Sequence, residues 1–232
     1  MRHVVAMGGG GFLGNEDATP LDAFVLSLVE RPEPRVCFVP TANGDAEREI
    51  EHFHSVFGRM HCEPSHLSLF RREPIDLTDA IAGQDVIYVG GGNTANLLAV
   101  WRLHGLDVVL TKRAEAGNLV VCGPSAGGLC WFECGVTDSF TPDLGPLHDG
   151  LGWIAGSFCP HYDEEPRRQP VYTELVRTGR LPPGLAADGG AAAHFTDGVL
   201  QRIVAERPGA TVHAVTVRDG EVTEIPMGAA QL

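Results

Sequence analysis

Short runs of continuous hydrophobic residues, separated by amphipathic segments, set the strongest limit on how this chain can fold. Several of these runs show no alternation of polar and apolar residues, which is typical of strands covered on both faces. Strands are predicted at 3–7, 35–40, 66–69, 85–89 and 118–122. Apolar side chains at helical spacing, or a helix-initiating proline, predict helices from Pro20 and over 46–60, 94–103 and 106–116.

This alternation of strands and helices predicts an α/β fold, with a mostly parallel sheet covered by helices on both faces. The C-terminal part has a different pattern. Short strands are predicted at Val199–Val204, Thr211–Val217 and Glu221–Ile225, with a hairpin turn at Asp219-Gly220. We expect them to form an antiparallel extension of the sheet. The chain has no linker or internal repeat, so residues 1–232 are expected to form a single domain.

Composition excludes several classes of function. The formal net charge of -13 argues against nucleic-acid binding, which needs a basic surface. No apolar run approaches the roughly 18 residues of a membrane span, and the N-terminus lacks a signal-peptide pattern. A cytoplasmic location is therefore expected. The six cysteines lack the paired spacing of a zinc site, so we expect neither a metal nor a cofactor.

A glycine-rich turn after the strand at 118–122 carries the clearest chemical signal. Gly123, Ser125 and Gly127 form the G-x-S-x-G pattern of a nucleophile elbow, between a buried strand and the start of a helix. Such a turn projects the serine hydroxyl from the carboxyl edge of the sheet, where α/β proteins bind ligands. The pattern predicts Ser125 as a nucleophile. The alternative is a glycine-rich turn that contains a serine by chance.

A second glycine cluster, Gly90-Gly91-Gly92, follows the strand at 85–89 and is expected at the same edge of the sheet. It lacks the spacing and the terminal lysine of nucleotide-binding loops. We expect a backbone N–H of Gly91 or Gly92 to face that of Ala126. Two donors from two loops would form an oxyanion hole.

A serine nucleophile also needs a base and an acid that orients it. His161 follows the largely apolar run 154–160 and lies downstream of Ser125, as expected for the base. The acid is left open between Asp138, Asp163 and Asp188, each of which is equally compatible with an ordinary turn aspartate.

The three motifs together resemble the dipeptidase E (aspartyl dipeptidase) and cyanophycinase family of serine peptidases, over roughly residues 80–200. The segments that carry the resemblance are Gly90-Gly91-Gly92-Asn93-Thr94, Gly123-Pro124-Ser125-Ala126-Gly127-Gly128 and Pro160-His161-Tyr162. The resemblance implies a flavodoxin-like three-layer sandwich related to the class I glutamine amidotransferase fold, with serine in place of the elbow cysteine. It also implies Ser125 as nucleophile and His161 as base.

For the acid, the resemblance favours Asp188, because the segment 184–189 matches one in which the dipeptidases have a glutamate. Asp138 matches another acidic position of the family and would support the site or the substrate amine. The family cleaves small peptides after an N-terminal aspartate or, in cyanophycinases, β-linked aspartyl-arginine. Arg167 or Arg168 is therefore expected to bind a substrate carboxylate, and Asn93 is a further candidate contact.

The expected function is that of a serine exopeptidase acting on dipeptides or short peptides. Carboxypeptidase-like or cyanophycinase-like cleavage and a small-molecule esterase or amidase are alternatives with the same chemistry. An alternative of another class is a catalytically silent, amidotransferase-like binding module. Small peptides are the expected partners, and the sequence leaves open whether the chain forms a homo-oligomer.

Overall fold

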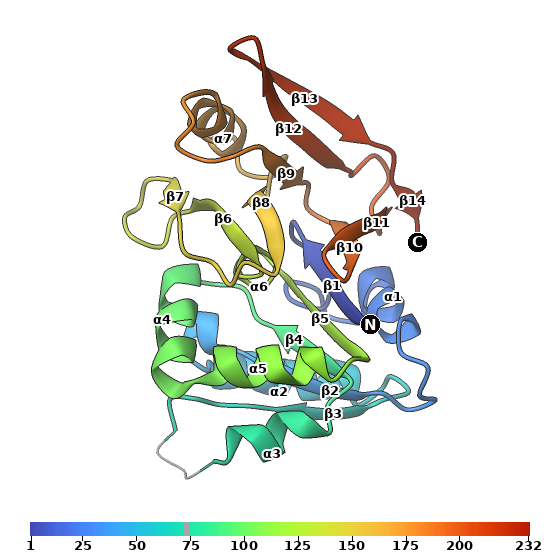
Figure 1. Cartoon of the computed structure of the whole chain (residues 1–232). Coiled ribbons are helices and arrows are strands. Elements are labelled where there is room, and N and C mark those ends of the chain that lie inside the picture. Colours follow the sequence, from blue (N-terminus) through green and yellow to red (C-terminus); the bar gives the residue numbers. More distant parts are fainter. Residues whose placement is uncertain (72–74) are drawn as a thin grey trace.

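The computed structural model describes residues 1–71 and 75–232. Its main sheet has the strand order β14-β11-β10-β1-β5-β4-β2-β3 (Figure 1). The five strands at one end of this order are parallel. They are β1 (Arg2–Met7), β2 (Arg35–Val39), β3 (Glu63–His66), β4 (Val86–Val89) and β5 (Leu119–Pro124). The mostly parallel sheet predicted from the hydrophobic runs is thereby confirmed.

Helices cover both faces of the parallel strands. On one face, α1 (Pro20–Ser27) and α2 (Glu47–Phe57) pack on strand residues such as Val5 and Tyr88. On the other, the strand residues of opposite parity, such as Val4 and Val89, share a core with three further helices. These are α3 (Leu77–Ala82), α4 (Thr94–His104) and α5 (Leu106–Glu115). Adjacent residues of each strand thus serve opposite layers, which explains the continuous hydrophobic runs.

Antiparallel strands extend the main sheet beyond β1, as predicted for the C-terminal part. β10 (Ala191–Thr196) pairs antiparallel with β1, and β11 (Val199–Ala205) pairs antiparallel with β10. The short strand β14 (Ala230–Gln231) adds to the edge beside β11. β10 was not predicted because it begins with three alanines, which favour strands weakly. All three are fully buried.

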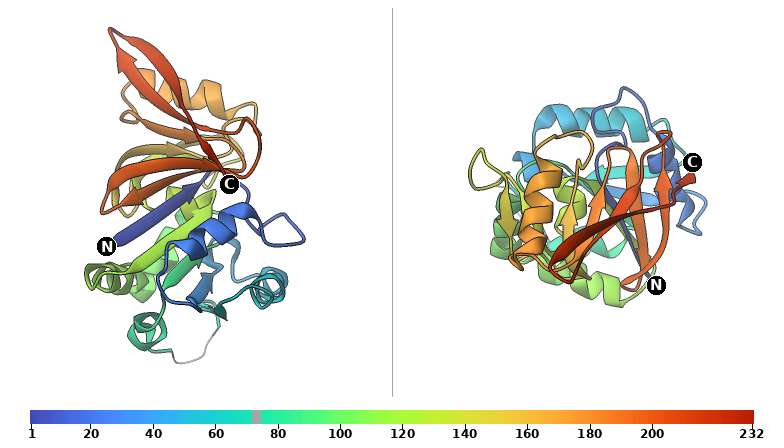
Figure 2. Two further views of the ribbon diagram at one scale, coloured as in Figure 1. Left: turned by 90° about the vertical axis from the view of Figure 1, so that its right-hand side faces the viewer. Right: turned by 90° about the horizontal axis from the view of Figure 1, so that it is seen from above.

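The C-terminal hairpin lies in a second sheet rather than in the main one, which corrects the prediction for 211–225. That sheet has the order β13-β12-β9-β8-β6-β7. Its members are β6 (Phe132–Thr137), β7 (Gly145–Leu147), β8 (Ile154–Cys159), β9 (Gly184–Ala187), β12 (Val212–Arg218) and β13 (Glu221–Met227). The hairpin of β12 and β13 joins the second sheet through the antiparallel pairing of β12 with β9. α7 (Arg168–Arg177) packs beside it (Figure 2).

Smaller differences concern exposed elements. The strand expected at 66–69 lies at 63–66, where it forms an exposed sheet edge without a hydrophobic pattern. The apolar residues that suggested it, Leu67 and Leu69, are buried just after the strand ends. In residues 1–71 and 75–232, no helix has both the length and the hydrophobicity needed to cross a membrane.

Candidate active site

Ser125 lies in a strained turn between β5 and the short helix α6 (Ala126–Leu129). Its backbone has φ 54° and ψ −116°, a conformation that L-residues rarely adopt and that clusters at functional sites. Close packing holds the turn. A Cβ atom at Gly123 or at Gly127 would lie 2.2 Å from the carbonyl oxygen of Val89. Only glycine fits at these two positions, which accounts for the elbow pattern.

The second glycine cluster lies directly beside the serine. A Cβ atom at Gly91 would be 3.8 Å from the Cβ of Ser125. The loop is anchored where the Asn93 N–H donates to the Ala42 carbonyl, 2.8 Å away. In the described part of the chain, the N–H groups of Gly91, Gly92 and Ala126 have no acceptor. The three groups expected to form an oxyanion hole thus lie around Ser125 with their donors unused.

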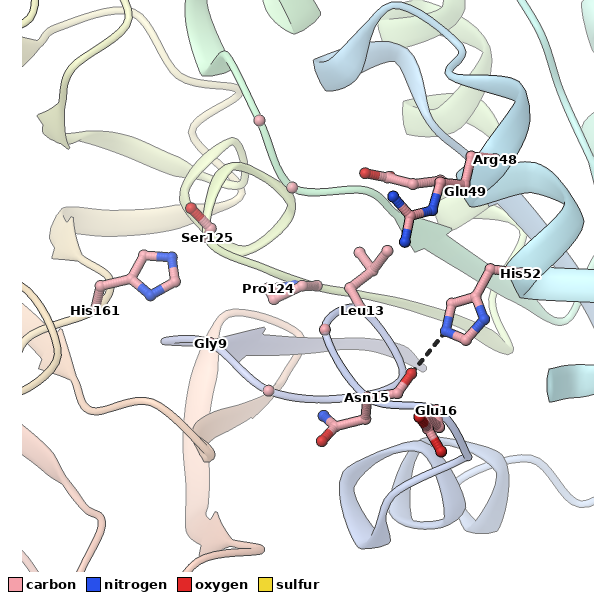
Figure 3. Close-up of a pocket in the computed structure, with 14 residues that line it drawn as sticks. Gly9, Leu13, Asn15, Glu16, Arg48, Glu49, His52, Pro124, Ser125 and His161 are labelled. Carbon is pink, nitrogen blue, oxygen red and sulfur yellow. Dashed lines mark hydrogen bonds between the residues drawn. The ribbon is translucent and has the colours of Figure 1, made fainter.

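His161 is brought to the site by the turn after β8. Its backbone is left-handed, with φ 54°, and its N–H donates to the Gly8 carbonyl at 3.1 Å. Figure 3 shows its ring directed toward Ser125. No hydrogen bond joins the two side chains within residues 1–71 and 75–232. Hydrogen bonds between catalytic groups often tighten only with substrate bound, so this geometry is compatible with His161 as the base.

The acid in contact with His161 is Glu164, not one of the three expected aspartates. Oε2 of Glu164 lies 2.7 Å from Nδ1 of His161. A carboxylate on one ring nitrogen fixes the tautomer and leaves the other nitrogen free to accept a proton. The turn that reverses the chain at His161 brings the residue three positions later back to the ring. A His-x-x-Glu spacing after a strand was the available sequence signal.

Asp188 contacts a different histidine. Oδ1 of Asp188 lies 3.4 Å from Nε2 of His213, and Oδ2 accepts a 2.9 Å hydrogen bond from the Thr211 N–H. The reason is strand parity: Ala186 faces the core under α7, whereas Ala187 faces the core shared with the main sheet. Asp188 therefore lies on the same face of the sheet as Ala186 and its cross-strand neighbour His213.

The pocket beside Ser125 has a volume of about 610 Å³. Three walls enclose it, as Figure 3 shows. One holds Ser125 and the glycine loop at 91–92, the second is the loop after β1 from Gly9 to Glu16, and the third is α2. From α2 the side chains are Arg48, Glu49 and His52, and Nε2 of His52 donates to the Asn15 carbonyl at 2.8 Å. Burial raises the pKa of the Glu49 carboxyl.

The four expected substrate contacts do not line this pocket. Asn93 accepts a hydrogen bond from the Asn96 N–H and so caps α4, and Asp138 is exposed after β6. Arg167 pairs with Asp143 on the surface. Arg168 is buried, where it pairs with Glu165 at 2.8 Å and donates to the Val136 carbonyl.

Arg48 is the cationic residue that sequence reasoning missed. It is the only lysine or arginine among the described residues that line the pocket. Its position follows from topology, because α2 comes after β2 and begins at the carboxyl edge of the sheet, where ligands bind in such folds.

A serine in a strained elbow, unused N–H donors around it and a histidine paired with a carboxylate are the arrangement typical of α/β serine hydrolases. Residues 4–203 match peptidase family S51, and the chain belongs to this family. It is therefore a serine peptidase of the dipeptidase E type, which confirms the resemblance found in the sequence.

Relatives agree with this assignment. The chain is 47% identical over 229 residues to the "Uncharacterized peptidase YgaJ" of Bacillus subtilis, covering 98% of this chain and 97% of the relative. It is 25% identical over 162 residues to the "Peptidase E" of Shewanella denitrificans, covering 66% of each.

Two crystal structures share the fold. A peptidase from an acI-B1 Actinobacterium superposes with a TM-score of 0.74 at 16% identity, covering 99% of this chain and 95% of that one. A putative peptidase E protein from Listeria monocytogenes superposes with a TM-score of 0.57 at 17% identity, covering 98% of both. The fold class predicted from the sequence is thus confirmed.

Proposed function

We propose that this protein is a serine exopeptidase that hydrolyses dipeptides or short peptides through an acyl-enzyme on Ser125. The observation that carries the proposal is the strained Ser125 turn, which shares one pocket with His161 and with the glycine loop at 91–92. A pocket of about 610 Å³ has room for a short peptide.

In the proposed reaction, His161 removes the proton of the Ser125 hydroxyl as the oxygen attacks the peptide carbonyl. The N–H groups of Ala126 and of the loop at Gly91 and Gly92 stabilise the oxyanion. His161 then passes the proton to the leaving amine, which departs with one half of the peptide. Water, deprotonated by His161, hydrolyses the acyl-enzyme and restores the serine. None of these steps needs a cofactor.

Glu164 is the proposed orienting acid, on the strength of its 2.7 Å contact with Nδ1 of His161. E164Q and D188N, which preserve side-chain shape, separate this role from the one expected for Asp188. We expect E164Q to lower kcat by about a hundredfold or more, since the wrong tautomer of an orienting pair costs up to about 10⁴-fold. D188N should retain most of the activity. If D188N lost activity and E164Q did not, Asp188 would be the acid that orients His161.

Arg48 is the proposed contact for a substrate carboxylate, in place of Arg167 and Arg168. It lines the pocket, whereas Arg167 is paired on the surface and Arg168 is buried in an ion pair. A guanidinium binds a carboxylate through two parallel hydrogen bonds. Whether that carboxylate is the C-terminus of the peptide or an acidic side chain decides which end of the substrate the enzyme holds.

Two experiments test the proposed function. A fluorophosphonate probe should label the wild-type protein and leave Ser125→Ala unlabelled; a folded wild-type protein that resists the probe would favour a silent binding module. A panel of dipeptides and short peptides, free or blocked at either end, then identifies the substrate. Aminopeptidase-like, carboxypeptidase-like and cyanophycinase-like cleavage give different patterns, and turnover of esters or simple amides alone would indicate a small-molecule hydrolase.

The single-domain organisation, the cytoplasmic location and the restriction of partners to small peptides stay predictions from the sequence.

A further inference from the structure

The contact between Glu164 and His161 is made by a side chain that is 48% exposed. An exposed ion pair contributes little by itself, because two side chains must be held in one geometry. A lasting contact of 2.7 Å therefore needs other groups that restrict the Glu164 carboxylate.

Two glycines supply part of this restriction by their close approach. A Cβ atom at Gly189 would lie 2.1 Å from Cδ and Oε1 of Glu164, and one at Gly9 would lie 3.0 Å from Oε2. The two glycines form a parallel bridge with each other, and the Gly190 N–H donates to the Gly9 carbonyl at 3.2 Å. The carboxylate thus rests on a surface of paired backbone.

That backbone is in turn held by Arg207, in the turn after β11. Its Nε and one terminal nitrogen donate to the Gly189 carbonyl at 3.2 and 3.0 Å. The same terminal nitrogen pairs with Asp163. Asp163 closes the arrangement, since its Oδ1 accepts from the Gly189 N–H at 2.8 Å. Arg207 therefore joins the two groups that flank Glu164: the preceding residue of its own turn and the glycine against which it packs.

We propose that Arg207 is a positioning residue for the catalytic base, acting through Gly189 and Asp163 to keep Glu164 against His161. The inference rests on the proposed role of Glu164. The role requires an arginine, because a guanidinium donates several hydrogen bonds in fixed directions at once. A lysine would reach Asp163 as a point charge and leave the Gly189 carbonyl with weaker contacts.

The test is a double-mutant cycle between Arg207 and Glu164. R207M, R207K, E164Q and R207M/E164Q are compared with wild type by kcat and KM on the best peptide and by the rate of fluorophosphonate labelling. R177M is the matched control, because it removes an exposed arginine–glutamate pair on α7.

We expect R207M to lower kcat and the labelling rate about tenfold with KM nearly unchanged, since small misplacements of catalytic groups are costly. R207K should recover only part of this loss. If Arg207 acts through Glu164, the double variant should be within about twofold of E164Q alone. R177M should match wild type, and all five variants should melt close to it because the replaced pairs are exposed.

Three results overturn the inference. Wild-type kcat in R207M would do so, as would losses that multiply in the double variant, which would indicate an effect independent of Glu164. Full activity of E164Q, with Ser125→Ala inactive, would remove the role of Glu164 and that of Arg207 with it. By contrast, an active Ser125→Ala would refute the proposed function itself.

Discussion

Replacing Gly189 by alanine tests most directly how the Glu164 carboxylate is held. The new Cβ atom would lie 2.1 Å from Cδ and Oε1 of Glu164, whereas ordinary contact begins at 3.4 Å. The carboxylate must therefore move by about 1 Å or more, because the opposing atoms of Gly189 are backbone and hydrogen-bonded on both sides. That displacement breaks or lengthens the 2.7 Å contact with His161.

The cost should fall on catalysis rather than on stability. Gly189 does not have a positive φ, so alanine fits its backbone conformation. The clash is with the far end of a flexible side chain, which can move. Replacing glycine by alanine also lowers the conformational entropy of the unfolded chain, which stabilises the folded protein by about 0.4–1 kcal/mol and offsets part of the cost of the clash. A misplacement of about 1 Å in a catalytic group costs up to about a hundredfold in rate. We expect kcat/KM to fall about 10- to 100-fold, or about 1.4–2.7 kcal/mol in activation free energy.

The assay is steady-state cleavage of the best peptide, with the melting temperature measured on the same preparations. G228A is the control, because a Cβ atom at Gly228 would meet open space. It should behave as wild type in both measurements. A folded G189A protein with wild-type kcat/KM would refute the view that Gly189 positions Glu164.

Three further predictions concern other parts of the molecule. Burial, with smaller contributions from the charges of His3 and Arg202, lowers the pKa of His194 from 6.5 to about 4. The unfolded chain therefore takes up a proton that the folded protein excludes. The free energy of unfolding should therefore fall by up to about 3 kcal/mol more in wild type than in H194Q as the pH decreases from 6.5 to 4. Urea unfolding of both proteins across this pH range measures the difference. G127A should lower the urea-unfolding free energy by about 2–4 kcal/mol, because the clash is with the Val89 backbone. R48Q should raise KM about tenfold for the peptides whose carboxylate it binds and leave kcat nearly unchanged, as steady-state kinetics would show.

The parallel half of the fold was predictable because burial on both faces leaves a mark in the sequence. Every residue of Val86–Val89 and Leu119–Pro124 is buried, and so each strand reads as an apolar run. In the second sheet, the strands at β8, β12 and β13 also leave a pattern in the sequence, but β9 does not. β9 is Gly-Leu-Ala-Ala, without a β-branched residue, and it forms only because β8 and β12 lie on either side of it. Such pairing joins distant segments and cannot be found from local patterns.

The elbow at Ser125 was predictable because the residues that its geometry requires lie close together in the sequence. Gly123 and Gly127, two positions before and after the serine, are both fixed by the approach of the Val89 carbonyl from the neighbouring strand, so a long-range contact leaves a short local pattern. The contacts of Arg167 and Arg168 do not have this property. Arg168 is buried against the Val136 carbonyl of β6, which depends on where α7 lies on the second sheet, and Arg167 pairs with Asp143 of a distant loop.

The carboxylate beside His161 shows how a shift of one position along an extended segment changes which side chains can meet. The segment after β9 does reach the site, as its sequence suggested, since Gly189 packs against the acid that contacts His161. Successive side chains of an extended segment point to opposite faces, so Asp188 faces His213 when position 189 faces Glu164. The position with the right parity is a glycine. This segment therefore leaves space beside His161 but supplies no carboxylate. The carboxylate comes from Glu164, because the left-handed backbone at His161 turns the chain so that Glu164 contacts the imidazole ring.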